Sequence, residues 1–211
     1  AKEQTEIKLE SKAWLDLAFH ASNPALSPNK QQVAVVERDK DGKTKLVIYS
    51  TEQNTQAAEE FAQTQQEILK NDPLDIVDSA PAVFKRKQQK VLNQINRAGI
   101  QNPQWLNDEE IYFGAYTRND DVENTRVADI FSWHVSTGEV KQLTELAGLR
   151  RFSIAGNGQI LYAERSRSGY SELVKYDIQT ATATPLFNKS LEDVFDYPVL
   201  SPNKAKLAER L

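Results

Sequence analysis

Short apolar runs, separated by clusters of turn-forming residues, repeat along this chain. Four segments share one order: an apolar residue, then a turn, then a run typical of β-strands. They span residues 24–36, 103–116, 152–165 and 198–210. Runs of this length, rich in β-branched and aromatic residues and bounded by Gly, Asn, Asp and Ser, predict strands. Because helical periodicity is weak inside them, we expect a chain built mainly of β-strands.

The spacing of the segments indicates a repeat architecture. Leu26, Trp105, Ile154 and Leu200 hold the same place in their segments, and we call them the anchor residues. The two later intervals between anchors match the roughly 40–50-residue length of a propeller blade, and the first interval is longer by roughly 30 residues. Each unit predicts four short strands. The sequence therefore predicts an all-β fold: a β-propeller of four-stranded blades, with three nearly complete blades and half of a fourth.

An insertion explains the extra length of the first interval. Residues 57–72 place apolar side chains, Phe61 and Ile68 among them, roughly on one helical face, and Pro73 ends the pattern. We expect residues 53–85 to form an insertion with one helix between the third and fourth strands of the first blade. Such loops often carry partner contacts. A helix that merely covers an exposed sheet edge is an equally weighted alternative.

The phrase Pro-x-Leu-Ser-Pro-Asn-Lys occurs twice, at residues 24–30 and 198–204. Pro fixes φ and the Asn side chain can bond the nearby backbone, so both copies predict a tight turn between the first two strands of a blade. We expect the Leu of each copy to pack between blades. We also expect Asn29 and Asn203 to tolerate the left-handed backbone region. A ligand-binding role for these two Asn residues is the less favoured alternative.

The phrase resembles the Pro-x-Trp/Phe-Ser-Pro-Asp-Gly repeat of TolB-like (WD-type) β-propellers. The residues that fit the repeat are Pro24, Leu26, Ser27, Pro28, Asn29 and Ala34, then Pro103, Trp105 and Asp108, then Pro198, Leu200, Ser201, Pro202, Asn203 and Ala208. Asn in place of Asp and Lys in place of Gly depart from the pattern, and the third unit keeps little of it. The resemblance covers nearly the whole chain except the insertion. It implies a six-bladed ring, of which residues 1–211 would form one incomplete propeller domain. A four-bladed ring closed by joining the two ends of the chain is the less favoured alternative.

Composition narrows the class of function. The formal net charge is −4, which argues against a nucleic-acid-binding role for this domain. No run of 18 apolar residues occurs, so a membrane tether would have to lie outside this chain. The chain has no cysteine, which excludes disulfides, Cys-based zinc sites and thiol catalysis. Together with a first residue, Ala1, that suggests a processed N-terminus, this composition fits the periplasm.

Few residues offer candidate chemistry. His20 and His134 have no second His or carboxylate at ligand spacing, so we expect structural roles rather than a zinc site. The Asp-Gly at 41–42 and the Gly-Asn-Gly at 156–158 predict hairpin turns rather than a calcium loop or a phosphate-binding loop. No Gly-x-Ser-x-Gly elbow occurs. We therefore predict no catalytic residue, no cofactor-binding residue, no metal site and no cofactor.

Charged stretches are also assigned to structure first. Residues 85–90 predict a charged outer-edge strand that prevents sheet-to-sheet aggregation, with contact to an anionic surface as the alternative. Residues 118–124 predict a solvated acidic loop, with a cationic partner as the alternative. Residues 164–172 predict a long polar hairpin.

Two functions fit this chain, because the propeller fold alone does not decide between them. The resemblance implies a non-catalytic binding or sensing propeller of the bacterial envelope, with a protein partner or small ligand at the propeller face. TolB itself docks a peptidoglycan-associated lipoprotein at the mouth of its propeller. Similar propellers form the periplasmic part of membrane-anchored regulators that resemble the CadC/ToxR type. The alternative is the gating propeller of a prolyl-oligopeptidase-like serine peptidase whose catalytic domain lies outside this chain. A propeller lyase or glycosidase would need His and carboxylate clusters that are sparse here.

Overall fold

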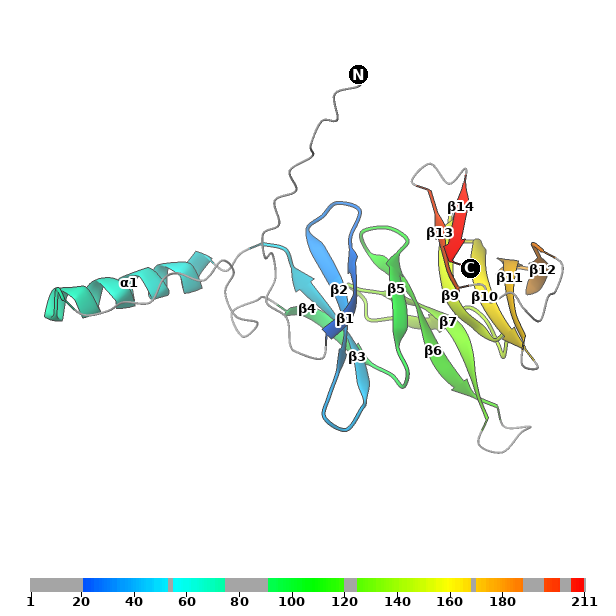
Figure 1. Ribbon diagram of the computed structural model, residues 1–211, viewed down its shortest axis with the longest axis horizontal. Helices are drawn as coiled ribbons and strands as arrows, with labels where there is room; N and C mark the ends of the chain where they lie inside the picture. The colour runs from blue at the N-terminus through cyan, green and yellow to red at the C-terminus, as the bar shows by residue number, and fades with distance from the viewer. Residues whose placement is uncertain are drawn as a thin grey trace, which may run out of the picture.

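Four antiparallel sheets follow one another along the chain (Figure 1). The computed structural model describes residues 21–52, 55–74, 91–119, 125–167, 170–187, 196–201 and 206–210. Blade one contains β1 (Ala21–Leu26), β2 (Gln32–Arg38), β3 (Thr44–Ser50) and β4 (Val91–Asn96). Blade two contains β5 (Gln101–Trp105), β6 (Glu110–Arg118), β7 (Arg126–His134) and β8 (Val140–Gln142). Blade three contains β9 (Leu149–Ala155), β10 (Ile160–Arg167), β11 (Tyr170–Asp177) and β12 (Thr182–Pro185), and blade four contains β13 (Asp196–Leu200) and β14 (Leu207–Arg210).

Within each four-stranded blade the strands pair in sequence order, so every blade is an antiparallel meander. The first strands of successive blades, β1, β5, β9 and β13, contact one another and form the inner edge of the stack of sheets. The predicted all-β propeller fold, with four-stranded blades and one helical insertion, is confirmed. The blade number of the complete ring stays a prediction.

Both faces of a blade are apolar, which explains why the strands show uninterrupted apolar runs. In β2, Ala34 and Val36 pack in the core that blade one shares with blade two, where Phe113 and Trp133 are fully buried. Val33 and Val35, together with their cross-strand neighbours, form a separate cluster on the opposite face of the same sheet. A strand that buries both faces has no reason to alternate apolar and polar residues.

A β-bulge interrupts the first strand of every blade shortly before its anchor residue. In three blades the extra residues include a proline: Pro24, Pro103 and Pro198. Because Pro has no N–H to donate, a bulge on an edge strand accommodates it without loss of a ladder hydrogen bond. The Pro that opens the repeated phrase therefore lies in the bulge, three residues before the turn begins.

The repeated phrase forms the predicted turn between the first two strands of a blade. In the first copy the Ser27 N–H donates to the Gln32 carbonyl at 2.9 Å, and the Gln32 N–H donates to Ser27 Oγ at 3.0 Å. In the second copy Ser201 and Lys206 make the same reciprocal pair at 2.8 Å and 2.9 Å. The same Ser-based pair thus closes the turn at both ends of the chain.

The residue of the first turn that adopts the left-handed region is Lys30, with φ of 62°. The tolerance expected of Asn29 is therefore not used in this turn, and Asn203 lies outside the described residues. The Asn29 side chain instead fixes the turn, because its Oδ1 accepts the Gln31 N–H at 2.9 Å and the Ser27 hydroxyl at 2.7 Å. Lys30 occupies the place that Gly holds in the TolB-like repeat. A residue with a Cβ is strained there by about 1–2 kcal/mol.

The anchor residues are less buried than the sequence predicts. Leu26 is 43% exposed, and the other three anchors are half-buried. Trp105 packs on the core shared with blade one, and Ile154 packs on the core shared with blade two. An anchor therefore faces the preceding blade. Since the described residues contain no blade before blade one, Leu26 remains exposed.

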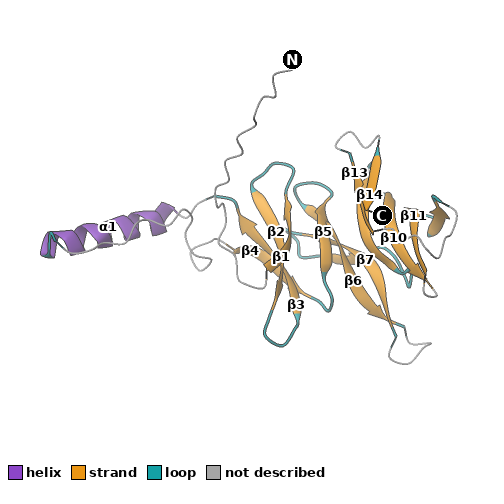
Figure 2. Cartoon of the chain, in the orientation of Figure 1, coloured by secondary structure: helices purple, strands orange, loops and turns teal. Residues whose placement is uncertain are grey.

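The helix α1 (Thr55–Asn71) lies between β3 and β4 in the chain, and Figure 2 shows it extending away from the sheets. Phe61, Gln65 and Ile68 follow one helical face and are half-buried, whereas Leu69 is 39% exposed. Residues 75–90 lie outside the described part of the chain, as do residues 1–20. The bounds 53–85 of the insertion and the assignment of 1–211 to one domain therefore stay predictions.

The strained turn predicts a stabilising substitution. We expect Lys30→Gly to raise the free energy of unfolding by about 1 kcal/mol, because glycine adopts positive φ without a steric penalty. Lys30→Ala is the matched control, since it removes the same charge and side chain but keeps the Cβ. Urea unfolding followed by tryptophan fluorescence measures both. Equal stability of the two variants would show that the backbone of Lys30 is not strained.

Candidate functional site

The turns of the blades gather at one end of the sheets. Because strands alternate in direction, the turn between first and second strands and the turn between third and fourth strands lie on the same side of a meander. Figure 1 shows the turns β1–β2 and β5–β6 at one end and the hairpin β2–β3 at the other. We call this end the turn face, and its turns span residues 27–31, 106–109, 135–139, 156–159 and 178–181.

The helical insertion starts on the turn face. The Thr51 N–H donates to the Gln31 carbonyl at 3.0 Å, and the Thr51 hydroxyl donates to the Lys30 carbonyl at 2.8 Å. These bonds attach the first residue after β3 to the turn of the repeated phrase. The root of the insertion and the turn of blade one are therefore a single hydrogen-bonded unit.

A second contact joins the turns of adjacent blades. The Asn29 N–H donates to Asp108 Oδ1 at 2.9 Å, and Asp108 lies in the corresponding turn of blade two. The phrase identifies Asp108 as a turn residue, but only the packing of the two blades brings its carboxylate to the Asn29 amide. The turn face is thus bonded across blades as well as within them.

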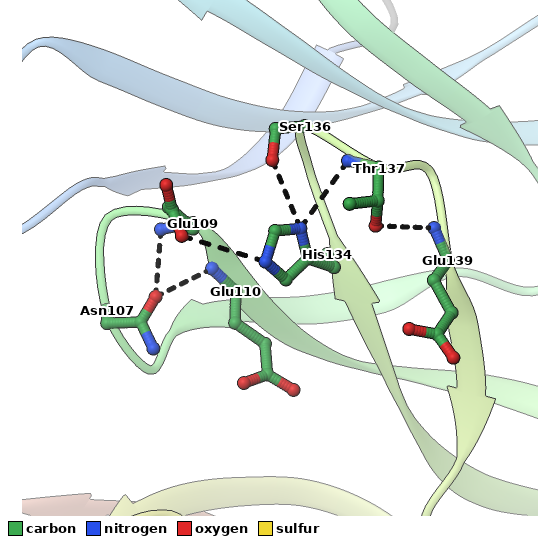
Figure 3. Close-up of polar contacts among 7 residues, drawn as sticks. All are labelled: Asn107, Glu109, Glu110, His134, Ser136, Thr137 and Glu139. Atoms are coloured by element: carbon green, nitrogen blue, oxygen red, sulfur yellow. Dashed lines mark hydrogen bonds and ion pairs between the residues drawn. The ribbon is translucent and has the colours of Figure 1, made fainter.

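His134 lies at the end of β7 on the turn face, between two turns of blade two (Figure 3). Its Nδ1 accepts the Thr137 N–H at 3.5 Å and lies 3.2 Å from Ser136 Oγ, and its Nε2 lies 3.7 Å from Glu109 Oε2. Because Nδ1 accepts, the ring hydrogen of the neutral tautomer sits on Nε2 and faces the carboxylate. The histidine side chain is about one-third exposed and that of Glu109 is 70% exposed.

The contacts of His134 with Ser136 and Glu109 link the two turns of blade two. Asn107 Oδ1 accepts the N–H groups of Glu109 and Glu110 at 2.8 Å and 2.9 Å, which fixes the turn that carries the carboxylate. Ser136 is two residues from His134 on the same exposed turn, and the course of the turn places its hydroxyl within hydrogen-bond distance of the ring. A nucleophilic serine needs, besides its base, an oxyanion site beside the reacting atom. The role that these contacts support is the structural one expected for His134, which stays a prediction.

A cavity of about 370 Å³ lies between the inner strands of blades two, three and four. Two amide groups on its wall, Asn102 Nδ2 at 3.0 Å and Gln104 Nε2, donate to the Phe152 carbonyl. On the far side the Ser153 hydroxyl donates to the Pro198 carbonyl at 2.6 Å, and Val199 is 58% exposed. The cavity therefore combines an apolar wall with side-chain oxygens that can accept hydrogen bonds from a ligand. We call it the inner-strand cavity.

Blade three contains buried ion pairs where the sequence predicts a polar hairpin. Arg165 Nε and Nη2 both donate to Glu172 Oε1, at 2.7 Å and 2.5 Å, with both side chains largely buried. Glu164 is also buried and lies 3.8 Å from Arg150 Nη1 and 3.4 Å from Arg151 Nη1. The predicted hairpin is confirmed by the antiparallel pairing of β10 with β11, and Glu164, Arg165 and Glu172 form their ion pairs within the sheet. Cross-strand register, which the sequence pattern left open, brings Arg165 and Glu172 together.

The other candidate residues have simple outcomes. Asp39 Oδ1 accepts the N–H groups of Asp41 and Lys43 at 2.9 Å and 2.8 Å, which confirms a hairpin turn with Gly42 at a φ of 78°. The turn at 156–158 joins β9 and β10, as predicted. His20, the basic stretch 85–90 and the acidic residues 120–124 lie outside the described residues.

No group of three or more His, Cys, Asp or Glu side chains in the described ranges could hold a metal ion. No helix in these ranges combines the length and apolar character that a membrane span requires.

Comparison with solved structures identifies the fold. TolB from Acinetobacter baumannii aligns with a TM-score of 0.54 at 15% identity, over 88% of this chain and 36% of that chain. A protein assigned as TolB from Agrobacterium tumefaciens aligns with a TM-score of 0.56 at 13% identity, over 92% of this chain and 56% of that chain. The present chain therefore spans only about a third to a half of the length of these proteins, and it has the fold of a TolB-like β-propeller.

More remote structures include peptidase propellers. The beta-propeller domain of the Trilobed protease from Pyrococcus furiosus aligns over 85% of this chain with a TM-score of 0.37 at 13% identity. No family model and no curated protein matches the chain.

The two kinds of ion pair predict contrasting effects. We expect Glu172→Gln to lower the free energy of unfolding by about 3 kcal/mol, because it leaves the buried Arg165 charge without its counter-charge. Glu139→Gln is the matched control: Glu139 pairs with Lys141 at 3.2 Å, but both side chains are more than half exposed. That control should change stability by less than about 0.5 kcal/mol. Urea unfolding compares them, and similar losses would mean that burial does not govern the Arg165–Glu172 pair.

Proposed function

We propose that this chain is a non-catalytic binding propeller of the bacterial cell envelope, working in the periplasm and binding a protein partner on its turn face. The observation that carries the proposal is the bonding of the insertion root to the repeated turn through Thr51. That bonding places the start of the helical insertion on the turn face, and the helix extends outward from there (Figure 2). Loops held on a rigid scaffold are where propellers and other β-folds commonly carry their binding residues.

The chemistry of this surface favours a protein partner over a small polar ligand. The helix presents Leu69, which is 39% exposed, beside the half-buried Phe61 and Ile68, and Leu74 just beyond it is 93% exposed. The turn face offers charged groups, including Glu109, Glu139 and Lys141. The helix therefore supplies apolar contact area and the turn face supplies charged groups, the two components of a protein-binding surface with an apolar centre and a polar rim. The fold of TolB proteins supports this class of function by analogy only.

Photo-crosslinking tests the proposal. A photoreactive residue in place of Leu69 or of Glu139 should yield a specific crosslinked protein from periplasmic extract of the source cell. The same residue in place of Lys43, an exposed position in the β2–β3 hairpin at the opposite end of the blade, is the matched control and should yield none. Crosslinks of equal yield from Lys43, or none from the other two positions, would contradict a partner on the turn face.

The full reading frame around this segment separates the candidate hosts of the propeller. A winged-helix domain and a membrane span upstream would support a regulator of the CadC/ToxR type. An α/β-hydrolase domain downstream would support the gating propeller of a serine peptidase and would overturn the non-catalytic proposal for the whole protein.

A further inference from the structure

A groove separates the outer parts of blades two and three. It has a volume of about 1110 Å³, and the connection from β8 to β9 forms one wall of it. A second hollow of about 330 Å³ shares Val127, Gly148 and Ser166 with it, so the two adjoin along these residues. We call the combined feature the interblade groove. The connection β8–β9 lies at the end of the sheets opposite the turn face, and the groove extends from this connection to Ala181 in the β11–β12 turn.

One wall of the groove contains a strained, exposed leucine. Leu146 has a φ of 48° and is 40% exposed. Asp129, which is fully buried, enforces this conformation: its carboxylate accepts the N–H groups of Leu146 and Ala147, each at 3.0 Å, and the Thr144 hydroxyl at 2.8 Å. Glycine would relieve the backbone strain. Strain of this kind concentrates at ligand-binding positions. An apolar side chain held in a strained conformation on the groove wall offers a contact for an apolar ligand group.

The inner end of the groove is basic. Arg126 is exposed and has no partner among the described residues, and Arg150, with a side chain 43% exposed, is 3.8 Å from Glu164. Both line the smaller hollow. Two arginines in one hollow suit a carboxylate, which can take paired N–H donors.

The floor of the groove adds two hydrogen-bond donors, the Arg165 guanidinium and the Tyr176 hydroxyl. Arg165 directs Nε and Nη2 to Glu172, which leaves Nη1 without a partner in the described part of the chain. The Tyr176 side chain also lines the groove, and burial, with the nearby Asp129 charge, raises its pKa, so that its hydroxyl stays protonated. These N–H and O–H groups match the carbonyl oxygens of a peptide backbone.

We propose that the interblade groove binds a protein C-terminus: the terminal carboxylate pairs with Arg126 and Arg150, and a preceding apolar side chain packs against Leu143 and Leu146. Each part of the groove matches one part of such a peptide. The basic end matches the carboxylate, the donors on the floor match the backbone carbonyls, and the apolar wall matches the apolar side chain. The exposed Glu145 beside Leu146 opposes a nucleic acid or another polyanion along the groove. The proposal does not depend on a partner at the turn face.

The probe is a fluorescein-labelled peptide, Gly-Ser-Gly-Ala-Leu-Ala, with a free C-terminal carboxylate, and the amidated peptide is its control. Fluorescence anisotropy should show binding of the acid form and roughly tenfold weaker binding of the amide, because the charge-assisted bonds are lost. Arg126→Ala should weaken binding of the acid form by about fivefold or more and leave the amide unchanged. Arg38→Ala, at an exposed position of blade one, is the matched control and should bind as the wild type does.

Leu146→Gly separates binding from folding. It should raise the melting temperature, since it relieves the positive φ, and at the same time weaken peptide binding by about fivefold. Amide shifts in nitrogen-15 spectra should move at Leu146, Gly148 and Ser166 on addition of the peptide. The proposal is overturned by equal binding of acid and amide, by full affinity in Leu146→Gly, by shifts that map elsewhere, or by no binding at millimolar peptide.

Discussion

The inner strand of each blade pairs with another strand on one edge only. The stacking of the blades depends on which groups form hydrogen bonds with the backbone of its other edge. Side chains of neighbouring blades supply the missing donors. Trp105 Nε1 donates to the Ala25 carbonyl at 2.9 Å, Asn102 Nδ2 donates to the Phe152 carbonyl at 3.0 Å, and Ser153 Oγ donates to the Pro198 carbonyl at 2.6 Å. A buried carbonyl without a donor costs about 1–3 kcal/mol, so these bonds fix how each blade meets the next.

The bulges and the interblade bonds act together. A bulge bends the inner strand and removes one residue from the ladder, which leaves backbone groups facing the neighbouring blade. Ala25 and Phe152, whose carbonyls accept interblade bonds, directly follow the bulges of their strands, and Pro198 lies within its own. The inner-strand cavity lies beside these junctions, because Phe152 and Pro198, whose carbonyls accept interblade bonds, also line it.

Among the described residues, three that are neither Gly nor Asn adopt positive φ, namely Lys30, Leu146 and Ala181, and the first two have different consequences. Lys30 adopts positive φ in a turn that Ser27 and Asn29 already determine, and it supports the root of the insertion through its carbonyl. Leu146 adopts positive φ because the buried Asp129 holds its backbone, and it lies on the wall of the interblade groove. At Lys30 the strained turn holds the start of the insertion. At Leu146 the strained backbone keeps an apolar side chain on the wall of the proposed binding groove.

The sequence by itself determined the blade repeat, the strand order, the turn of the Ser-Pro-Asn-Lys phrase and the helical insertion, because these follow from local apolar patterns and turn chemistry. It did not determine that Lys30 takes the left-handed conformation, because Asn29 has the higher intrinsic preference for that conformation. In the folded turn, the Asn29 side chain instead accepts hydrogen bonds from Ser27 and Gln31. The bond from Asn29 to Asp108, the buried pairing of Arg165 with Glu172 and both cavities were decided by tertiary structure alone. Each of these features depends on strand register or on the contact of two blades, and none of them is encoded in a single stretch of the chain.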